Sequence, residues 1–271
     1  MRRTFLLASL IVGLAAFTTA FASTAGADSI APISFEPPQY TVGDINGQQG
    51  WMKTNPAFDV KVASVADKYN FDTQALRLSD AVTSGSFGDQ TFSPGLTEPA
   101  GEATGLNKRF SATFWIGTVL PTVQAGLHLS VSPDNGSGAR MSYLRFEDQA
   151  DGVHVFFDDV QQPGPCTPAG CANFTDTDIA TLSRTRAHSI RFGITFKTGP
   201  GNDVVRIYID GALATTGTTW EDYYRYDPEA AGNGNQVSPV SKLLFRESGT
   251  AHPANAGKGF LVDRVSLDSD F

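Results

Sequence analysis

The most constraining feature of this sequence is an apolar–polar alternation that runs into a tight turn near residue 210. Val205, Ile207 and Ile209 alternate with polar or amphipathic residues, which is the period of a half-buried strand. Asp210 and Gly211 then supply two residues that readily adopt positive φ, as a two-residue hairpin requires. The residues that follow form the expected returning strand, so this segment predicts an antiparallel sheet.

Strand patterns with the same period recur along the chain, and turn residues separate them. The sequence predicts strands at 33–36, 58–64, 75–79, 110–117, 126–132, 139–147, 152–159, 187–197, 204–209, 212–216, 242–247 and 259–268. A short helix is expected within 220–231, and a long surface excursion is expected over 80–107. Many strands without intervening helices predict an all-β, antiparallel sandwich or barrel. No linker divides it, so we expect residues 28–271 to form a single domain.

The N-terminus has the pattern of an export signal. Arg2 and Arg3 form a short basic region, and an apolar run of about 17 residues follows. Small residues then fit cleavage after Ala27 or, alternatively, after Ala22. We therefore expect residues 1–27 to be a signal peptide and the mature protein to be secreted. An uncleaved membrane anchor and export by the twin-arginine route are the alternatives.

The charge balance excludes one class of partner. The formal net charge is −8, and removal of Arg2 and Arg3 takes the mature chain to −10, because no acidic residue precedes Asp28. Nucleic-acid binding requires a basic surface, so we expect no nucleic-acid partner. No later apolar segment is long enough to span a bilayer, so no transmembrane segment is expected in the mature chain.

The two cysteines fit an oxidising compartment. Cys166 and Cys171 lie in a segment rich in proline and glycine, whose turns can bring the two sulfurs together. We expect a structural disulfide, which on the chain-entropy model contributes roughly 2 kcal/mol for so short a loop. A redox-active pair is the alternative, but it requires a helix N-terminus that the sequence does not show.

Two motifs resemble a known superfamily. The pattern apolar-Tyr-apolar-Asp-Gly-x-Leu at 207–213 resembles the hairpin of concanavalin A-like lectin/glucanase folds, the laminin G-like jelly rolls. The closing strand at 259–269, with an opening strand that ends at Glu36, is similar to secreted bacterial β-jelly-roll modules. The resemblance implies two stacked antiparallel sheets. It implies no particular reaction, because lectins, glycosidases, polysaccharide lyases and adhesion modules share this fold.

The same resemblance implies one metal site. Similar modules hold a structural Ca²⁺ between acidic residues of the first and last strands and backbone carbonyls. Glu36 and Asp263 occupy those positions here, so calcium is the one cofactor we expect. Because Ca²⁺ takes six to eight oxygen ligands, two carboxylates do not specify the site, and a plain surface pair is the alternative.

An aromatic cluster follows the hairpin and is the first candidate ligand site. It consists of Trp220, Tyr223, Tyr224 and Tyr226. As a sugar platform, the flat rings would stack on pyranose C–H surfaces while the hydroxyls bind the sugar edges. As structural residues, they would instead attach the loop to the sandwich.

Basic side chains on the polar faces of strands form the second candidate site. Arg191, Arg206 and His154 each alternate with apolar neighbours. If their strands share one concave sheet, they form a basic groove suited to an anionic glycan. The alternative is that they are solvated residues of the convex face.

These candidates lead to a ranked functional prediction. The acidic segment at 147–151 does not match the Glu-x-Asp-x-Glu pattern of glycosidases in this superfamily, and its Asp-Gly end is typical of a hairpin tip. We expect a secreted carbohydrate-binding module without catalysis, whose partner is a glycan or polysaccharide. A polysaccharide lyase that uses Arg, His and Tyr is the first alternative. A structural or adhesion module is the second.

The disulfide is directly testable by intact mass. The secreted protein should be two hydrogens lighter than the reduced chain, and one peptide should contain both Cys166 and Cys171. Thiols that react with an alkylating agent in the absence of reductant would contradict the assignment.

Overall fold

The computed structural model describes residues 27–66, 68–86, 88–160, 174–228, 230 and 237–270. The expected signal peptide up to residue 26 lies outside the described residues. Cys166 and Cys171 also lie outside them, so the disulfide stays a prediction.

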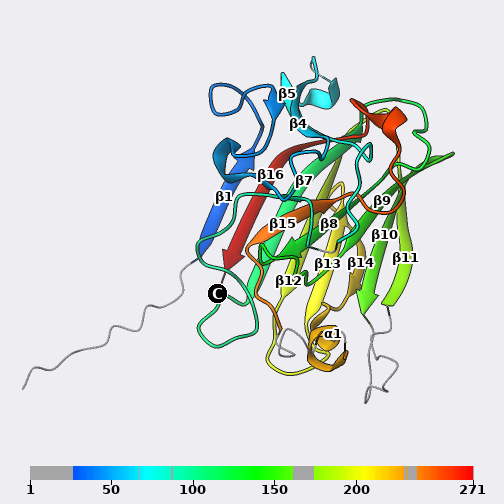
Figure 1. Ribbon diagram of the computed structural model, residues 1–271. Coiled ribbons are helices and arrows are strands. Elements are labelled where there is room, and N and C mark those ends of the chain that lie inside the picture. Colours follow the sequence, from blue (N-terminus) through cyan, green and yellow to red (C-terminus); the bar gives the residue numbers. More distant parts are fainter. Residues whose placement is uncertain are drawn as a thin grey trace, which may run out of the picture.

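The described residues form two antiparallel sheets that pack face to face (Figure 1). The nine-stranded sheet has the order β14-β13-β12-β7-β16-β5-β4-β2, with β1 paired to β16. Its strands are β1 (Asp28–Ile33), β2 (Gly43–Asp44), β4 (Val60–Ser64), β5 (Gln74–Leu78), β7 (Arg109–Thr118), β12 (His188–Thr195), β13 (Val204–Ile209), β14 (Ala212–Gly217) and β16 (Phe260–Asp270). The predicted all-β, two-sheet β-sandwich of the jelly-roll type is confirmed.

The seven-stranded sheet has the order β11-β10-β9-β8-β15-β6-β3. Its strands are β3 (Met52–Lys53), β6 (Thr91–Phe92), β8 (His128–Asp134), β9 (Leu144–Gln149), β10 (Gly152–Val160), β11 (Phe174–Leu182) and β15 (Lys242–Arg246). The helices are short: α1 (Glu221–Tyr226) and 3-10 turns at Gln48–Gly50, Lys68–Asn70 and Pro253–Asn255. Within the described part of the chain, no helix is long and apolar enough to cross a membrane.

The core consists of the side chains that the alternation turns inward from both sheets. Phe114 of β7 contacts Phe146 of β9, with ring centroids 6.1 Å apart, and Phe245 of β15 at 6.0 Å. All three rings are fully buried. They join the two sheets directly, and the residues that alternate with them face away from the core.

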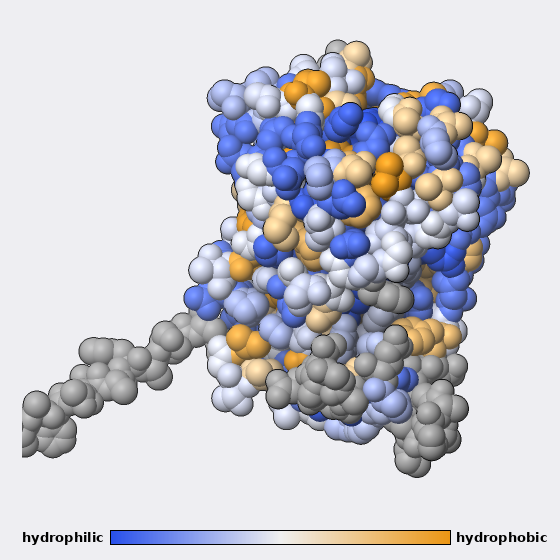
Figure 2. All heavy atoms as spheres, in the orientation of Figure 1, coloured by the Kyte–Doolittle hydropathy of each residue, from blue (hydrophilic) through white to orange (hydrophobic). Residues whose placement is uncertain are grey.

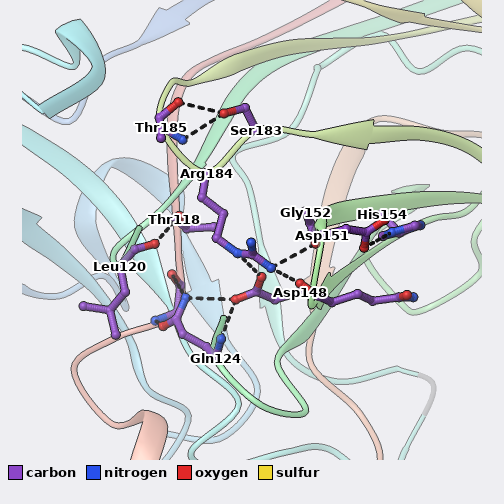
Figure 3. Close-up of polar contacts among 12 residues, drawn as sticks. Thr118, Leu120, Gln124, Asp148, Asp151, Gly152, His154, Ser183, Arg184 and Thr185 are labelled. Carbon is purple, nitrogen blue, oxygen red and sulfur yellow. Dashed lines mark hydrogen bonds and ion pairs between the residues drawn. The ribbon is translucent and has the colours of Figure 1, made fainter. Parts of the chain in front are cut away.

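A buried ion pair ties the β9–β10 hairpin to the neighbouring loops (Figure 3). The Arg184 guanidinium donates from Nε to the Asp148 carboxylate at 2.6 Å and also binds the Gln149 carbonyl. Asp148 also accepts the backbone N–H of Gln124 at 2.7 Å. Because the Asp148 side chain is fully buried, these donors offset the cost of removing its charge from water.

The predicted hairpin at Asp210-Gly211 is confirmed by the backbone. Asp210 has φ 50° and Gly211 has φ 82°, and the flanking strands pair as β13 and β14. The predicted first strand at 33–36 is wrong, because β1 ends at Ile33. Phe35 has φ 59°, a left-handed conformation that cannot continue a strand, so Glu36 lies beyond β1.

The structure differs from the prediction at two further places, one strand and one long loop. The strand β11 was not predicted, because its sequence FTDTDIATL carries polar residues on both faces. The segment 80–107 was expected to be a surface excursion, yet it contains β6 and is partly buried. Gln90 exchanges two hydrogen bonds with the backbone of Glu247, at 2.6 and 2.7 Å, so this loop packs against the end of β15.

The Glu247 side chain should make stability depend on pH. It is fully buried, and neither carboxylate oxygen has a hydrogen-bond partner among the described residues. Burial raises its pKa well above the ordinary value. The folded state therefore holds the proton more tightly than the unfolded state, and the free energy of unfolding falls as pH rises above the ordinary pKa.

We expect Glu247→Gln to raise the melting temperature at pH 8 by several degrees, roughly the effect of 1–2 kcal/mol in a chain of this size. The two proteins should converge as the pH falls toward the ordinary carboxyl pKa. Thermal melts across this range provide the measurement, with exposed Glu98→Gln as the matched control. An equal pH response in Glu247→Gln and the wild type would contradict the assignment.

Candidate functional site

A cavity of about 850 Å³ lies against the outer face of the seven-stranded sheet, next to α1. We call it the aromatic pocket. One side consists of aromatic rings, contributed by Tyr143, Phe174, Trp220 and Tyr223. Figure 1 shows α1 at one end of the sandwich, where the ends of neighbouring strands also lie.

Trp220 organises the aromatic side of the pocket. Its indole Nε1 donates to the backbone carbonyl of Asp158 at 3.0 Å. Its ring stacks on Tyr143, with centroids 5.8 Å apart and planes inclined by 20°, and meets Phe174 edge-on at 4.9 Å. Only 5% of Trp220 is exposed, so this residue both lines the pocket and attaches the loop to the sheet.

The four aromatic residues predicted as a platform do not all face the pocket. Trp220, Tyr223 and Tyr224 line it, and Tyr223 is half-buried. Tyr224 is 4% exposed, and burial raises the pKa of its phenol. Tyr226 is 41% exposed and is not among the lining residues.

The polar side of the pocket carries two arginines and one aspartate. Arg140, Arg246 and Asp158 all line the cavity. Arg140 and Arg246 are 1% and 7% exposed, and both guanidiniums interact electrostatically with the Tyr143 phenol. The guanidinium of Arg140 lies 5.7 Å from the centre of the Tyr143 ring.

Asp158 is the carboxyl group of the pocket. Its Oδ1 is buried and has no hydrogen-bond partner among the described residues. Burial, together with the charge of Asp176 on the neighbouring strand, raises the pKa of Asp158 to about 6. The side chain can therefore donate a proton in mildly acidic solution and carries a negative charge above that pH.

The basic residues predicted as a single groove lie on different sheets. Arg191 and Arg206 are exposed on β12 and β13 of the nine-stranded sheet. The Arg191 guanidinium stacks on the Tyr208 ring at 3.9 Å. His154 belongs to β10 of the seven-stranded sheet, so the expected groove does not form.

His154 lies on the same sheet as the pocket but does not line it. Its Nδ1 lies 2.6 Å from Asp178, and its Nε2 lies 2.8 Å from Asp151 (Figure 3 shows the Asp151 contact). Hydrogen bonds to Asp178 and then Asp151 raise the pKa of His154. Both ring nitrogens are thus used in a surface ion-pair network.

Sequence reasoning missed five residues that carry the chemistry of the pocket: Arg140, Tyr143, Asp158, Phe174 and Arg246. Asp158 alternates with the inward residues of its predicted strand, and this pattern indicates that its side chain lies on the outer face of the sheet. Tyr143 precedes β9, and Phe174 opens the unpredicted β11. Arg140 falls in the predicted strand 139–147, but this prediction is wrong at its start, because β9 begins at Leu144 and Arg140 lies in the loop before it.

The residues expected to hold calcium fit a cation in part. Asp263 is fully buried, and neither of its carboxylate oxygens has a hydrogen-bond partner among the described residues. Burial, together with the smaller effect of the charges of Asp72 and Glu36, raises its pKa to about 7. Glu36 accepts backbone N–H groups of Thr73 and Gln74 at 2.9 and 2.7 Å.

Across the described ranges, no three His, Cys, Asp or Glu side chains converge as a metal centre. A cation beside Asp263 would therefore need backbone carbonyl oxygens as further ligands. The calcium site stays a prediction.

The chain was compared with known proteins. Its sequence matches no protein-family model and no curated protein sequence. Among solved structures, a sialidase aligns with 89% of this chain at 11% identity and a TM-score of 0.50, and this chain spans 18% of the sialidase.

Two further structures align over a larger share of their own length but with lower TM-scores. The alginate lyase Aly36B aligns over 92% of this chain and 100% of its own, with 12% identity and a TM-score of 0.47. An endo-1,3-beta-glucanase from Streptomyces sioyaensis aligns over 90% of each chain, with 11% identity and a TM-score of 0.42. Likeness at such identities shows the fold alone, and the sialidase shares the two-sheet β-sandwich that the strand order of this chain defines.

The calcium prediction is tested by thermal melts of the mature protein in EDTA and in about 1 mM Ca²⁺. We expect Ca²⁺ to raise the melting temperature of the wild type by roughly 5 °C, as a ligand near 100 times its dissociation constant would. Asp263→Asn should abolish this response, and Asp268→Asn, an exposed residue of the same strand, should keep it. An equal response of both variants would exclude Asp263 as a ligand.

Proposed function

We propose that the protein binds a carbohydrate in the aromatic pocket. The observation that carries the proposal is the wall of aromatic rings around a cavity of about 850 Å³. Aromatic faces stack on the C–H surfaces of sugar rings, and nearby polar groups bind the hydroxyls. The fold shared with a sialidase supports the same ligand class.

The finer proposal is a secreted module that binds a glycan without turnover. The residues that support binding are rings placed by packing: Phe174 and Tyr223 stand against the anchored Trp220, at 4.9 and 6.1 Å. Such preorganised surfaces lower the entropic cost of binding. Neither secretion nor the absence of catalysis is needed for the binding proposal itself.

A polysaccharide lyase is the second candidate, and one observation favours it. The Tyr143 phenol lies in the pocket close to both guanidiniums, where it could move a proton beside a neutralised acid group. An increase in ultraviolet absorbance from an unsaturated product would identify this activity. If no acidic polysaccharide that binds gives this increase, the lyase is excluded for those ligands and the binding module is the function that is left.

The adhesion alternative has less support. Large exposed hydrophobic residues of the described surface come from separate elements: Val42, Met52, Val123, Phe174, Leu213 and Tyr226. Figure 2 shows hydrophobic residues scattered among hydrophilic ones on one face of the molecule. A protein-binding surface would show a contiguous apolar patch.

Two tyrosines of α1 provide a matched test. Tyr223 lines the pocket, whereas Tyr226, three residues later, is exposed away from it. For an oligosaccharide selected on a glycan array, we expect Tyr223→Ala to weaken binding by about 1–3 kcal/mol, because a stacking face is lost. Tyr226→Ala should bind as the wild type does. Isothermal titration measures both affinities.

Trp220 is less suited to this test, because Trp220→Ala also removes the hydrogen bond to Asp158 and should lower the melting temperature. Unchanged affinity in a well-folded Tyr223→Ala protein would exclude the platform.

A further inference from the structure

Two buried cations border the aromatic pocket on one side. Arg140 and Arg246 both line the cavity although these residues are only 1% and 7% exposed. Each interacts electrostatically with Tyr143, and the charge of Arg246 disfavours the charge on Arg140. The two like charges are therefore close neighbours, which is costly without an anion nearby.

Two carboxylates that do not line the cavity contribute to the balance of this charge. Asp134 acts on Arg140, and Asp89 acts on Arg246, but neither aspartate lines the pocket. Asp134 also accepts the backbone N–H groups of Gly136 and Gly138, at 2.6 and 3.1 Å. Asp158 is the one carboxyl group among the described lining residues, so two cations and one acid face the cavity.

Both guanidiniums are held in place before any ligand arrives. Arg246 donates from Nε to the Ser86 carbonyl at 2.9 Å and from Nη2 to the Ser84 carbonyl at 3.0 Å. Arg140 lies over the ring of Tyr143. The two hydrogen bonds fix the plane of the Arg246 guanidinium, and a fixed guanidinium loses little entropy when it binds a carboxylate or sulfate.

A third arginine of the same sheet shows the contrast. Arg145 of β9 forms ion pairs with Glu147 and Asp176 and does not line the cavity. Its charge is thus matched by acidic neighbours on the surface, as in an ordinary surface ion pair. Arg140 and Arg246 differ from Arg145 in position, because both are buried and line the cavity.

We propose that Arg140 and Arg246 form an oxyanion subsite, which selects carbohydrates bearing a carboxylate or a sulfate group. The inference rests on the proposed carbohydrate binding and names its ligand class. The sugar ring would contact the aromatic side, and its acidic group would contact the arginine pair. Because the whole protein carries a formal charge of −8, short-range contacts and not long-range attraction would provide this selectivity.

The experiment uses three hexasaccharide probes of equal length: a neutral glucan, a polyuronate and a sulfated galactan. Isothermal titration compares the wild type with Arg246→Gln and Arg246→Lys. Arg206→Gln, which removes an exposed arginine from the opposite sheet, is the control. Melting temperatures confirm that each variant is folded.

We expect at least one acidic probe to bind the wild type about tenfold or more tightly than the neutral probe. Arg246→Gln should remove most of this preference, because it weakens acidic binding far more than neutral binding, whereas Arg246→Lys should keep part of it. Preference for the polyuronate or for the galactan identifies the carboxylate or the sulfate as the recognised group. Arg206→Gln should change nothing.

Three outcomes would overturn the subsite. If neutral and acidic probes bind the wild type equally, the subsite is refuted and carbohydrate binding stands. The same conclusion follows if Arg246→Gln loses the same affinity for neutral and for acidic probes. If no oligosaccharide binds, the proposed function fails, and the subsite is tested with sodium sulfate and free glucuronate. If neither ion raises the melting temperature of the wild type by more than it raises that of Arg246→Gln, the subsite is overturned as well.

Discussion

The contact of Phe114 with the opposite sheet is the constraint on which the rest of the structure depends. Its ring meets Phe146 and Phe245, which belong to two different strands of the seven-stranded sheet. Truncation of a fully buried Phe to Ala costs about 3–5 kcal/mol. Side chains alternate between the two faces of a strand. The residues next to the inward-facing side chains of β9, β10 and β15 therefore face away from the core. Arg246 and Asp158 must then face outward, and the pocket is built from that outward set.

The pocket in turn depends on a loop that the sheet does not provide. Trp220 precedes α1 and is fixed to β10 by one hydrogen bond and to the residue before β9 by its stacking on Tyr143. The two interpretations of the aromatic cluster, platform and structural anchor, are therefore not exclusive. The buried Trp220 anchors the wall, and the more exposed rings of Tyr223 and Phe174 extend it. A ligand would meet a surface whose shape was set during folding.

The sequence was sufficient for the fold and for the aromatic part of the site, but not for its charged part. Alternation and turn residues predicted β13, β14 and their hairpin because such patterns are local. The strand β11 escaped, since an edge strand with polar residues on both faces lacks that period. Arg140 and Arg246 are more than 100 residues apart, and only the pairing of β15 with β8 brings their segments together. Strand order of this kind is a property of the tertiary structure.

The two aspartates of β11 affect whether the sandwich can pair with strands of other molecules. β11 is the outermost strand of its sheet, so within the described residues one of its edges has no partner strand. An open edge is a template for adding strands from other molecules, which is a common route to aggregation. Asp176 and Asp178 are exposed on this edge, and a second copy of β11 would place like charges against them. The same carboxylates that pair with Arg145 and His154 thus make the addition of a second copy of β11 at this edge less favourable.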